Sequence, residues 1–183
     1  MKKLVLSVLG TDRPGIVAAV SRVLFEHGCN IEDVNQTNLQ TEFAGVFVAS
    51  VPADLDAETL QGHLQKSVQH MGVQVLVKDL EAHSHLATPP SEPFVVTTVG
   101  PDRLGLVAGI TEVMARFGVN ITSLKAVFRG GDLPHHNIMI YEVSIPLETD
   151  QIAFRHALRQ RADELGLDLS LQHRDVFQAS QRI

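Results

Sequence analysis

The stretch GTDRPG at residues 10–15 returns as GPDRLG at residues 100–105, ninety positions later. When residues 10–36 are aligned with residues 100–126, ten of the 27 positions carry the same residue. A match of this length indicates an internal duplication and not a chance hexapeptide. The architecture of one copy is therefore expected twice along the chain.

The offset between the copies changes once. The triplet at residues 50–52, SVP, matches SIP at residues 144–146 at an offset of 94 instead of 90. Four residues are therefore inserted in the second copy, where RGGDLP at residues 129–134 has the composition of a loop. Since the offset is constant on either side of this loop, both copies are expected to contain the same elements in the same order.

Each copy predicts the order strand, helix, strand, strand, helix, strand. In the first copy, a Leu- and Val-rich strand leads into a helix whose apolar residues recur with helical spacing and which ends at Gly28. Two extended segments follow, then a helix with Asp56 at its N-cap, then an alternating strand. The predicted strands are 3–9, 31–40, 44–51 and 73–77.

This order predicts an α+β chain of two tandem ferredoxin-like βαββαβ domains. Each domain is a four-stranded antiparallel sheet with two helices on one face. The predicted domains span residues 1–80 and 93–178. The polar, Pro-containing segment EAHSHLATPPSE at 81–92 forms the linker between them, and residues 179–183 form a tail.

Composition excludes several classes of function. The formal net charge is −6 and no cluster of Lys or Arg occurs, which disfavours direct binding to nucleic acid. No apolar run reaches the length of a membrane span. Cys29 is the only cysteine, so the sequence predicts no internal disulfide and favours a reducing, cytoplasmic location.

The repeated bend has the chemistry to hold a small zwitterion. The start of a helix offers free N–H groups and a partial positive charge to a carboxylate. Gly15 allows close approach, Asp12 is an acceptor for an ammonium group, and the amide of Asn30 offers both donors and acceptors. A structural alternative stays open, in which Asp12 caps the helix, Gly10 supplies a positive φ and Asn30 occupies a left-handed position.

The motif G-x-D-R-x-G-[IL]-V-A, followed by a helix and then G-x-N-I, resembles the ACT domain, and the resemblance covers essentially the whole chain. Residues 10–43 are especially similar to the tandem ACT-domain repressors of the glycine cleavage system. The resemblance implies a binding protein and not an enzyme. Such domains commonly hold an amino acid near the first strand-helix loop, where two domains meet. The implied regulator acts on a DNA-bound transcriptional activator, and a small amino acid, glycine or serine, controls it.

The ligand-binding residues predicted on this basis lie at the two bends and at the two strand starts that follow the helices. They are Thr11, Asp12, Arg13, Pro14, Gly15, Asn30, Ile31, Asp102, Arg103, Leu104, Gly105, Asn120 and Ile121. Because the bends differ at their second and fifth positions, the number of working sites, one, two or none, stays open.

Other functions are disfavoured. The histidines at 83, 85, 135 and 136 lack a spaced set of further ligands, so the sequence predicts no metal and no cofactor. Deformylases and phosphatases with similar N-terminal parts carry their catalysis in a separate domain, for which the repeats leave no room. The alternative to the regulator is a ligand-free ACT module that acts by homodimerisation or by docking on a partner.

Overall fold

The computed structural model describes residues 2–80, 89–128 and 137–180 of the 183-residue chain. The chain divides into two compact units, Met1–Ser84 and His85–Ile183. Each unit is described by itself below. Within the described residues, no helix combines the length and the apolar composition that crossing a membrane requires.

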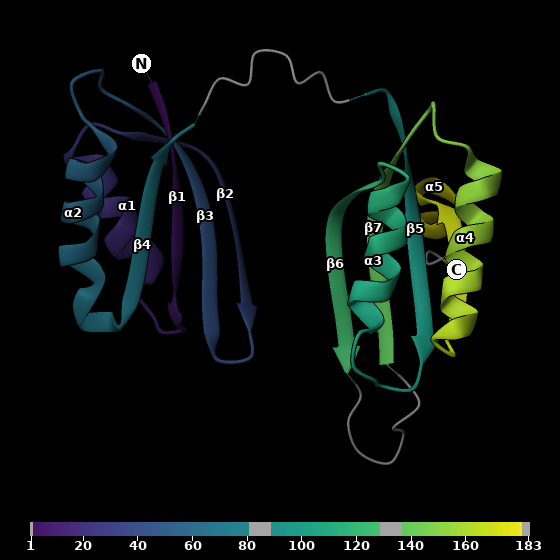
Figure 1. Cartoon of the computed structure of the whole chain (residues 1–183). Helices are drawn as coiled ribbons and strands as arrows, with labels where there is room; N and C mark the ends of the chain where they lie inside the picture. The colour runs from purple at the N-terminus through teal and green to yellow at the C-terminus, as the bar shows by residue number, and fades with distance from the viewer. Residues whose placement is uncertain (1, 81–88, 129–136, 181–183) are drawn as a thin grey trace. The chain divides into compact units, whose positions relative to one another are not determined.

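The first unit has the predicted βαββαβ order, with α1 and α2 on one face of the sheet (Figure 1). Its strands pair antiparallel in the order β2-β3-β1-β4. A short 3₁₀ turn, Gln69–Met71, joins α2 to β4. The elements are β1 (Lys2–Thr11), α1 (Ile16–Glu26), β2 (Asn30–Leu39), β3 (Glu42–Val51), α2 (Ala57–Val68) and β4 (Val73–Asp79).

The second unit repeats this order, with strands paired as β6-β7-β5-β8, so the predicted tandem ferredoxin-like fold is confirmed. Strand β5 begins at Ser91, inside the predicted linker, and the inserted loop lies outside the described residues. The elements are β5 (Ser91–Gly100), α3 (Leu106–Arg116), β6 (Asn120–Phe128), β7 (Asn137–Pro146), α4 (Gln151–Glu164), β8 (Asp168–His173) and α5 (Arg174–Ser180).

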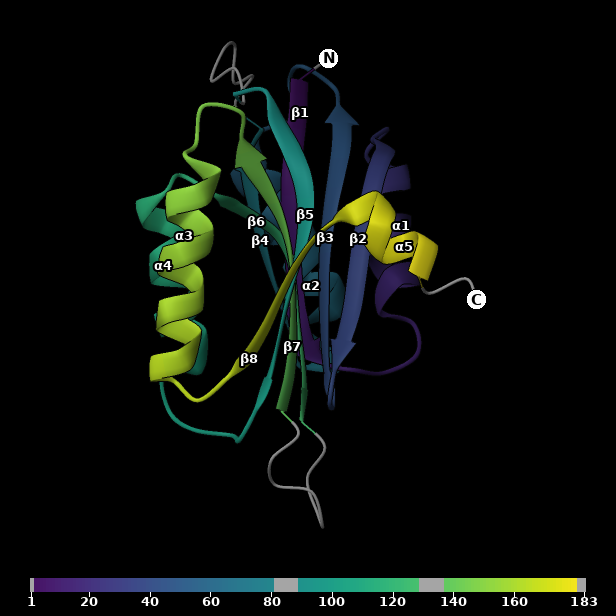
Figure 2. The ribbon, with the colours of Figure 1, turned by 90° about the vertical axis from the view of Figure 1, so that its right-hand side faces the viewer.

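Helix α5 was not predicted. It follows β8 directly and contacts β5 and β8. Figure 2 shows it on the opposite side of this sheet from α3 and α4. Val95, which points to that side, is only 3% exposed. In the second domain, α5 therefore covers part of the sheet face that lies away from the other two helices. Within its described residues, the first domain has no such helix, and the corresponding face of β1, β3 and β4 is open.

Each unit has its own core between the helices and the facing side of the sheet. In β1 the residues that face the helices alternate with outward-facing ones, as an antiparallel sheet with one covered face requires. The residues of this strand that pack into the core, all at most 1% exposed, are Leu4, Leu6 and Val8. Helix α1 adds the residues that its predicted spacing picked out, Ile16, Val20, Val23 and Leu24.

The predicted N-cap at Asp56 is confirmed. Its carboxylate accepts hydrogen bonds from the backbone N–H of Thr59 at 2.7 Å and from the Thr59 hydroxyl at 2.8 Å. These bonds lower the pKa of Asp56. Asp150 has the same role in the second unit, where one carboxylate oxygen accepts from the N–H groups of Ile152 at 3.0 Å and Ala153 at 2.9 Å.

Removing the second cap is expected to destabilise the second domain modestly. Asp150→Ala leaves two N–H groups of α4 without their acceptor, which costs about 1 kcal/mol. Urea unfolding followed by circular dichroism measures the loss. Glu148→Ala, an exposed change just before the helix, is the matched control and should shift the transition by less than about 0.5 kcal/mol. Equal effects of the two variants would contradict the capping role.

Candidate functional site

The first bend joins β1 to α1. The N-cap residue of α1 is Gly15, which has a left-handed conformation with φ of 101°, and no side chain caps the helix. The interpretation of Asp12 as a helix cap is therefore wrong, because the helix begins three residues later than that role requires. The first turn of α1 keeps its N–H groups free of any side-chain acceptor and contains no acidic residue.

A cavity of about 620 Å³ opens at this helix start. It lies between the bend, the first turn of α1 and the neighbouring part of β2. Its lining includes four of the predicted ligand-binding residues, Asp12, Arg13, Pro14 and Gly15. The remaining lining residues are Ile16, Val17, Ala18, Gln36, Asn38 and Phe43.

Asp12 is held in place from two sides. Its carboxylate accepts a hydrogen bond from Nδ2 of Asn38 at 2.7 Å, and its backbone N–H donates to the carbonyl of Thr41 at 2.7 Å. Arg13 beside it makes no ion pair with any residue in the described part of the chain. The cavity therefore combines a fixed acceptor, an unpaired guanidinium and the free N–H groups of a helix start.

The second bend is built differently. Gly105 again precedes the helix in a left-handed conformation, with φ of 85° and without a side-chain cap. Arg103, however, donates from Nη2 to the carbonyl of Leu165 at 2.6 Å, at the end of α4. Asp102 accepts a longer hydrogen bond from Nδ2 of Asn137, at 3.4 Å. The arginine of this bend is thus engaged in the fold, whereas Arg13 has no such partner among the residues that the structure describes.

Several predicted residues lie elsewhere. Thr11 belongs to β1, where its hydroxyl donates to Glu42 at 3.5 Å, and Leu104 is fully exposed. Asn30 and Ile31 lie at the far end of the sheet, since Asn30 pairs with Ser50 whereas Gly10 pairs with Phe43.

The β3 partners of these two residues, Phe43 and Ser50, lie seven positions apart, which corresponds to about 24 Å along the strand. Asn120 and Ile121 are placed likewise, at the end of the second sheet away from Gly100. Within each domain, the structure therefore does not bring these four strand-start residues to the bend.

Sequence reasoning missed the strand residues that do reach the bends. Asn38 and Gln36 project from β2 into the first cavity, and Asn137 opens β7 beside the second bend. The signal that could have found them is the hairpin register. Gly10 pairs with Phe43, which in turn pairs with Asn38, so the register places Asn38 beside the first bend. Gly100 pairs directly with Asn137, which places Asn137 beside the second bend.

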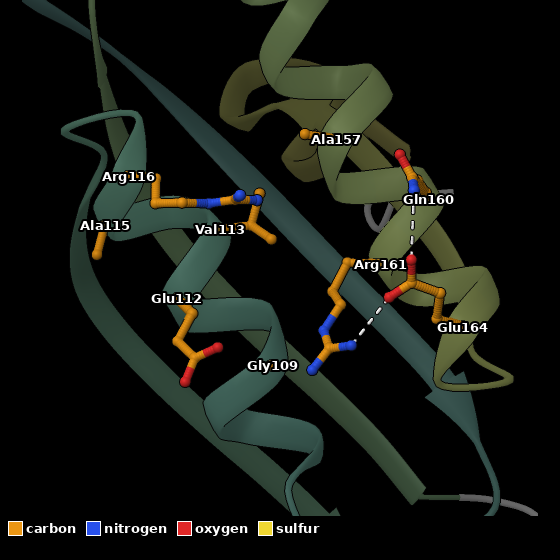
Figure 3. A pocket seen from close by; sticks show the side chains of 9 residues that line it. All are labelled: Gly109, Glu112, Val113, Ala115, Arg116, Ala157, Gln160, Arg161 and Glu164. Atoms are coloured by element: carbon orange, nitrogen blue, oxygen red, sulfur yellow. Dashed lines mark hydrogen bonds and ion pairs between the residues drawn. The ribbon is translucent and has the colours of Figure 1, made fainter.

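Another cavity of about 620 Å³ lies between α3 and α4 (Figure 3). In Figure 3 the Arg161 side chain reaches from α4 towards Gly109 on α3. Its guanidinium donates to the carboxylate of Glu164 at 2.9 Å, and Gln160 donates to the same carboxylate at 3.3 Å. Because Arg161, Gln160 and Glu164 are already paired with one another, these three groups are less available to a ligand than Arg13 at the first bend.

Cys29 and the histidines were the remaining candidates for a reactive or metal-binding site. The Cys29 thiol donates to the carbonyl of His27 at 3.7 Å, and burial raises its pKa, so the reactive thiolate is disfavoured. No group of three His, Cys, Asp or Glu side chains is arranged to hold a metal ion among the residues that the structure describes. The histidines at 83, 85, 135 and 136 lie outside those residues.

Comparison with known proteins identifies the fold family. The ACT domain model matches residues 2–78 and again residues 92–172. A UPF0237 protein of Methanopyrus kandleri is 46% identical over 79 residues, which cover 43% of this chain and 88% of the relative. The phosphoserine phosphatase SerB2 of Mycobacterium tuberculosis is 23% identical over 142 residues, 77% of this chain and 34% of the phosphatase.

Solved structures that span both domains of this chain include the following two. A protein of unknown function from Galdieria sulphuraria has a TM-score of 0.76 at 27% identity, covering 94% of this chain and 98% of the other. A protein given as a candidate glycine cleavage system transcriptional repressor has a TM-score of 0.68 at 22% identity, covering 93% and 96%. With the family model matched twice and the fold repeated in both units, the chain belongs to the ACT domain family.

Proposed function

We propose that the protein is an amino-acid-responsive regulator whose ligand binds at the first bend. The observation that carries this proposal is the chemistry of the first cavity. The free N–H groups of α1 and the unpaired guanidinium of Arg13 suit a carboxylate, and the carboxylate of Asp12 suits an ammonium group. A small amino acid presents both groups a few ångströms apart.

Glycine or serine is the proposed ligand. A small side chain suits a cavity whose lining includes apolar residues of α1 and Phe43. The choice of glycine also follows from the similarity of residues 10–43 to glycine cleavage repressors. The proposed output is transcriptional co-regulation through a DNA-bound activator, because a net charge of −6 without a basic cluster does not suit binding to DNA itself.

Isothermal titration calorimetry of the full chain with glycine and with L-serine tests the ligand. Asp12→Asn removes the charge that faces the ammonium group while keeping the size of the side chain. We expect it to weaken binding at the first bend at least tenfold, since a hydrogen bond between charged groups contributes about 1.5–3 kcal/mol. Asp54→Asn, an exposed change in a turn of the same domain, is the matched control.

Two results would contradict the ligand proposal. One is a folded protein that releases no heat with either amino acid, and the other is equal binding by the Asp12 and Asp54 variants. A pull-down from cell extract with and without glycine then tests the partner. We expect glycine to change the amount of captured partner, because a ligand shifts a two-state equilibrium only through different affinities for the two states.

The alternative function is a ligand-free docking module, and the outer face of the first sheet favours it. Leu9, Val46 and Leu76 lie on adjacent strands there and are 54%, 47% and 60% exposed. Such an apolar group on an open sheet face suits a homodimer or another protein partner. This alternative predicts that Asp12→Asn leaves partner capture unchanged.

A further inference from the structure

The edge strand β4 of the first sheet is covered by side chains of α2. Strand β4 is the last strand of its sheet and pairs with β1, so alternate backbone groups of β4 point away from the sheet. The carboxamide of Gln65 accepts from the N–H of Val75 at 2.9 Å and donates to the carbonyl of Val73 at 2.9 Å. Gln61, one turn earlier, accepts from the N–H of Val77 at 2.8 Å. These glutamines occupy the groups through which another strand would pair.

The corresponding edge strand β8 of the second sheet lacks this cover. By strand register, its outward-facing N–H groups include those of Leu169 and Leu171, two positions apart as in β4. Neither N–H has a hydrogen-bond acceptor in the part of the chain that the structure describes. The helix positions of the two glutamines are taken by Arg155 and Arg159, at the offset of 94 that relates this part of the two copies. A guanidinium has only N–H donors, so neither arginine can accept from these amides.

The two arginines also have no carboxylate partner among the described residues. The guanidinium carbon of Arg155 lies 5.6 Å from the centre of the Phe94 ring, which also contacts the ring of His173 at the end of β8. A cavity of about 780 Å³ on α4 is lined in part by both arginines and by Ile152, which is 83% exposed. The two acidic residues of this lining follow Arg159 by at least one turn of the helix.

The arginines have the spacing that an added strand requires. Four residues of an α-helix span about 6 Å, and alternate residues of a strand, whose side chains share one face, lie about 6.6 Å apart. The first domain shows this match directly, since Gln61 and Gln65 reach N–H groups two residues apart on β4. Two acidic side chains on one face of a strand beside β8 would therefore each meet one arginine.

The charges decide which kind of strand fits this edge. A second copy of the chain, paired through β8 about a twofold axis, would bring α4 beside its own copy. Arg155 and Arg159 would then face the same two arginines of the other chain, and like charges placed together oppose association. An acidic segment instead gives each guanidinium a carboxylate.

We propose that the edge of β8 binds an extended acidic segment of a partner protein, which adds a strand to the second sheet. The backbone of this segment pairs with the free groups of Leu169 and Leu171, and two of its acidic side chains bind Arg155 and Arg159. Backbone pairing supplies affinity, and the carboxylates supply specificity. In the first domain, the glutamines of α2 already occupy the corresponding groups. The proposal does not depend on an amino acid bound at the first bend.

Fluorescence anisotropy of the labelled peptide Thr-Val-Glu-Val-Glu-Val-Thr with the full chain tests the proposal. We expect the unaltered chain to bind it and Arg155→Gln/Arg159→Gln to bind it at least about tenfold more weakly. That double variant carries the glutamines of the first domain, so it should keep its fold and cover the β8 amides. Arg22→Gln/Arg116→Gln removes two exposed arginines of α1 and α3 and is the matched control, with binding unchanged. The peptide with Lys in place of Glu should not bind.

Hydrogen exchange of the edge amides shows where the peptide binds. Without peptide, the amides of Leu169 and Leu171 should exchange faster than those of Val75 and Val77, which the glutamines cover. Bound peptide should slow exchange at Leu169 and Leu171 at least about tenfold and leave the two β4 amides unchanged.

Four results would overturn the proposal. They are no binding of the acidic peptide at millimolar concentration, equal weakening by the two double variants, bound peptide that leaves exchange at Leu169 and Leu171 unchanged, and protection of these amides in a dimer without peptide. Sedimentation velocity detects the last case, which would assign the edge to a second copy of the chain. None of these results bears on glycine at the first bend, which calorimetry tests separately.

Discussion

Gly10→Ala is expected to lower the free energy of unfolding of the first domain by about 3 kcal/mol. Gly10 lies in β1, which is hydrogen-bonded on both sides, to β3 and to β4. A methyl group at this position would lie 2.7 Å from the carbonyl oxygen of Gly72 and 2.9 Å from the Cα of Val73. Both are backbone atoms, so no side chain can rotate away, and β1 and β4 would have to separate.

Urea unfolding and hydrogen exchange of the β1 and β4 amides measure this loss. Gly62→Ala is the matched control, because Gly62 lies within α2 and an added methyl group meets nothing within 4 Å. That change should stabilise the domain by about 0.5–1 kcal/mol through helix propensity alone. A Gly10 variant as stable as the unaltered protein would show that the strands can separate without cost.

Gly100 has the same role in the second domain, with a different neighbour. Its added methyl group would lie 2.7 Å from a terminal carbon of Leu167 and 2.9 Å from the carbonyl oxygen of Gly166. The Leu167 side chain can move, whereas the carbonyl cannot. At both Gly10 and Gly100, glycine is required because the start of a neighbouring strand comes too close for a side chain. The expectation that Gly10 supplies a positive φ is wrong. The positive φ lies five residues on, at Gly15.

This example shows what the sequence could and could not predict. The repeat and the apolar spacing predicted the order of elements, because both depend on local periodicity. The function of Gly10 depends on how β4 pairs with β1, which brings Gly72 and Val73 against it from sixty residues away. Such contacts arise from strand register, and a single sequence does not contain the register of distant strands.

The candidate site was predicted only in part, because part of it also depends on strand register. The bend residues Asp12 to Gly15 are contiguous in sequence and line one cavity. Asn30 was grouped with them because it follows the same helix, but α1 carries the chain to the opposite end of the sheet before β2 begins. Strand β2 then returns, and its later residue Asn38 is the amide that reaches the bend.

The only tyrosine of the chain should stay un-ionised well above pH 10 while the protein is folded. Tyr141 lies on β7 with no exposed surface, and its hydroxyl donates to the sulfur of Met139, at 3.3 Å. Burial raises the pKa of Tyr141 to about 12, because the phenolate would lose its hydration in the core. Absorbance at the phenolate band during an alkaline titration measures this directly.

The raised pKa links ionisation to unfolding. The folded state holds the phenol proton between about pH 10 and pH 12, where the unfolded chain releases it. The contribution of the Tyr141 phenol to the free energy of unfolding is therefore fully present below pH 10 and falls as the pH rises. The loss amounts to between about 2 and 3 kcal/mol once pH 12 is reached. Because other contributions can also change stability at alkaline pH, the loss must be measured against a variant without the phenol.

Tyr141→Phe is that variant, since it removes only the hydroxyl from the core position. Near pH 7 we expect its stability to lie within about 1 kcal/mol of the unaltered protein, because the hydrogen bond to sulfur is weak. The difference between the two proteins should then grow from pH 10 upward in favour of the phenylalanine variant. A phenolate signal at pH 10 from folded protein, or two stability curves that stay parallel to pH 12, would show that the β7 face of this core admits water to the phenol.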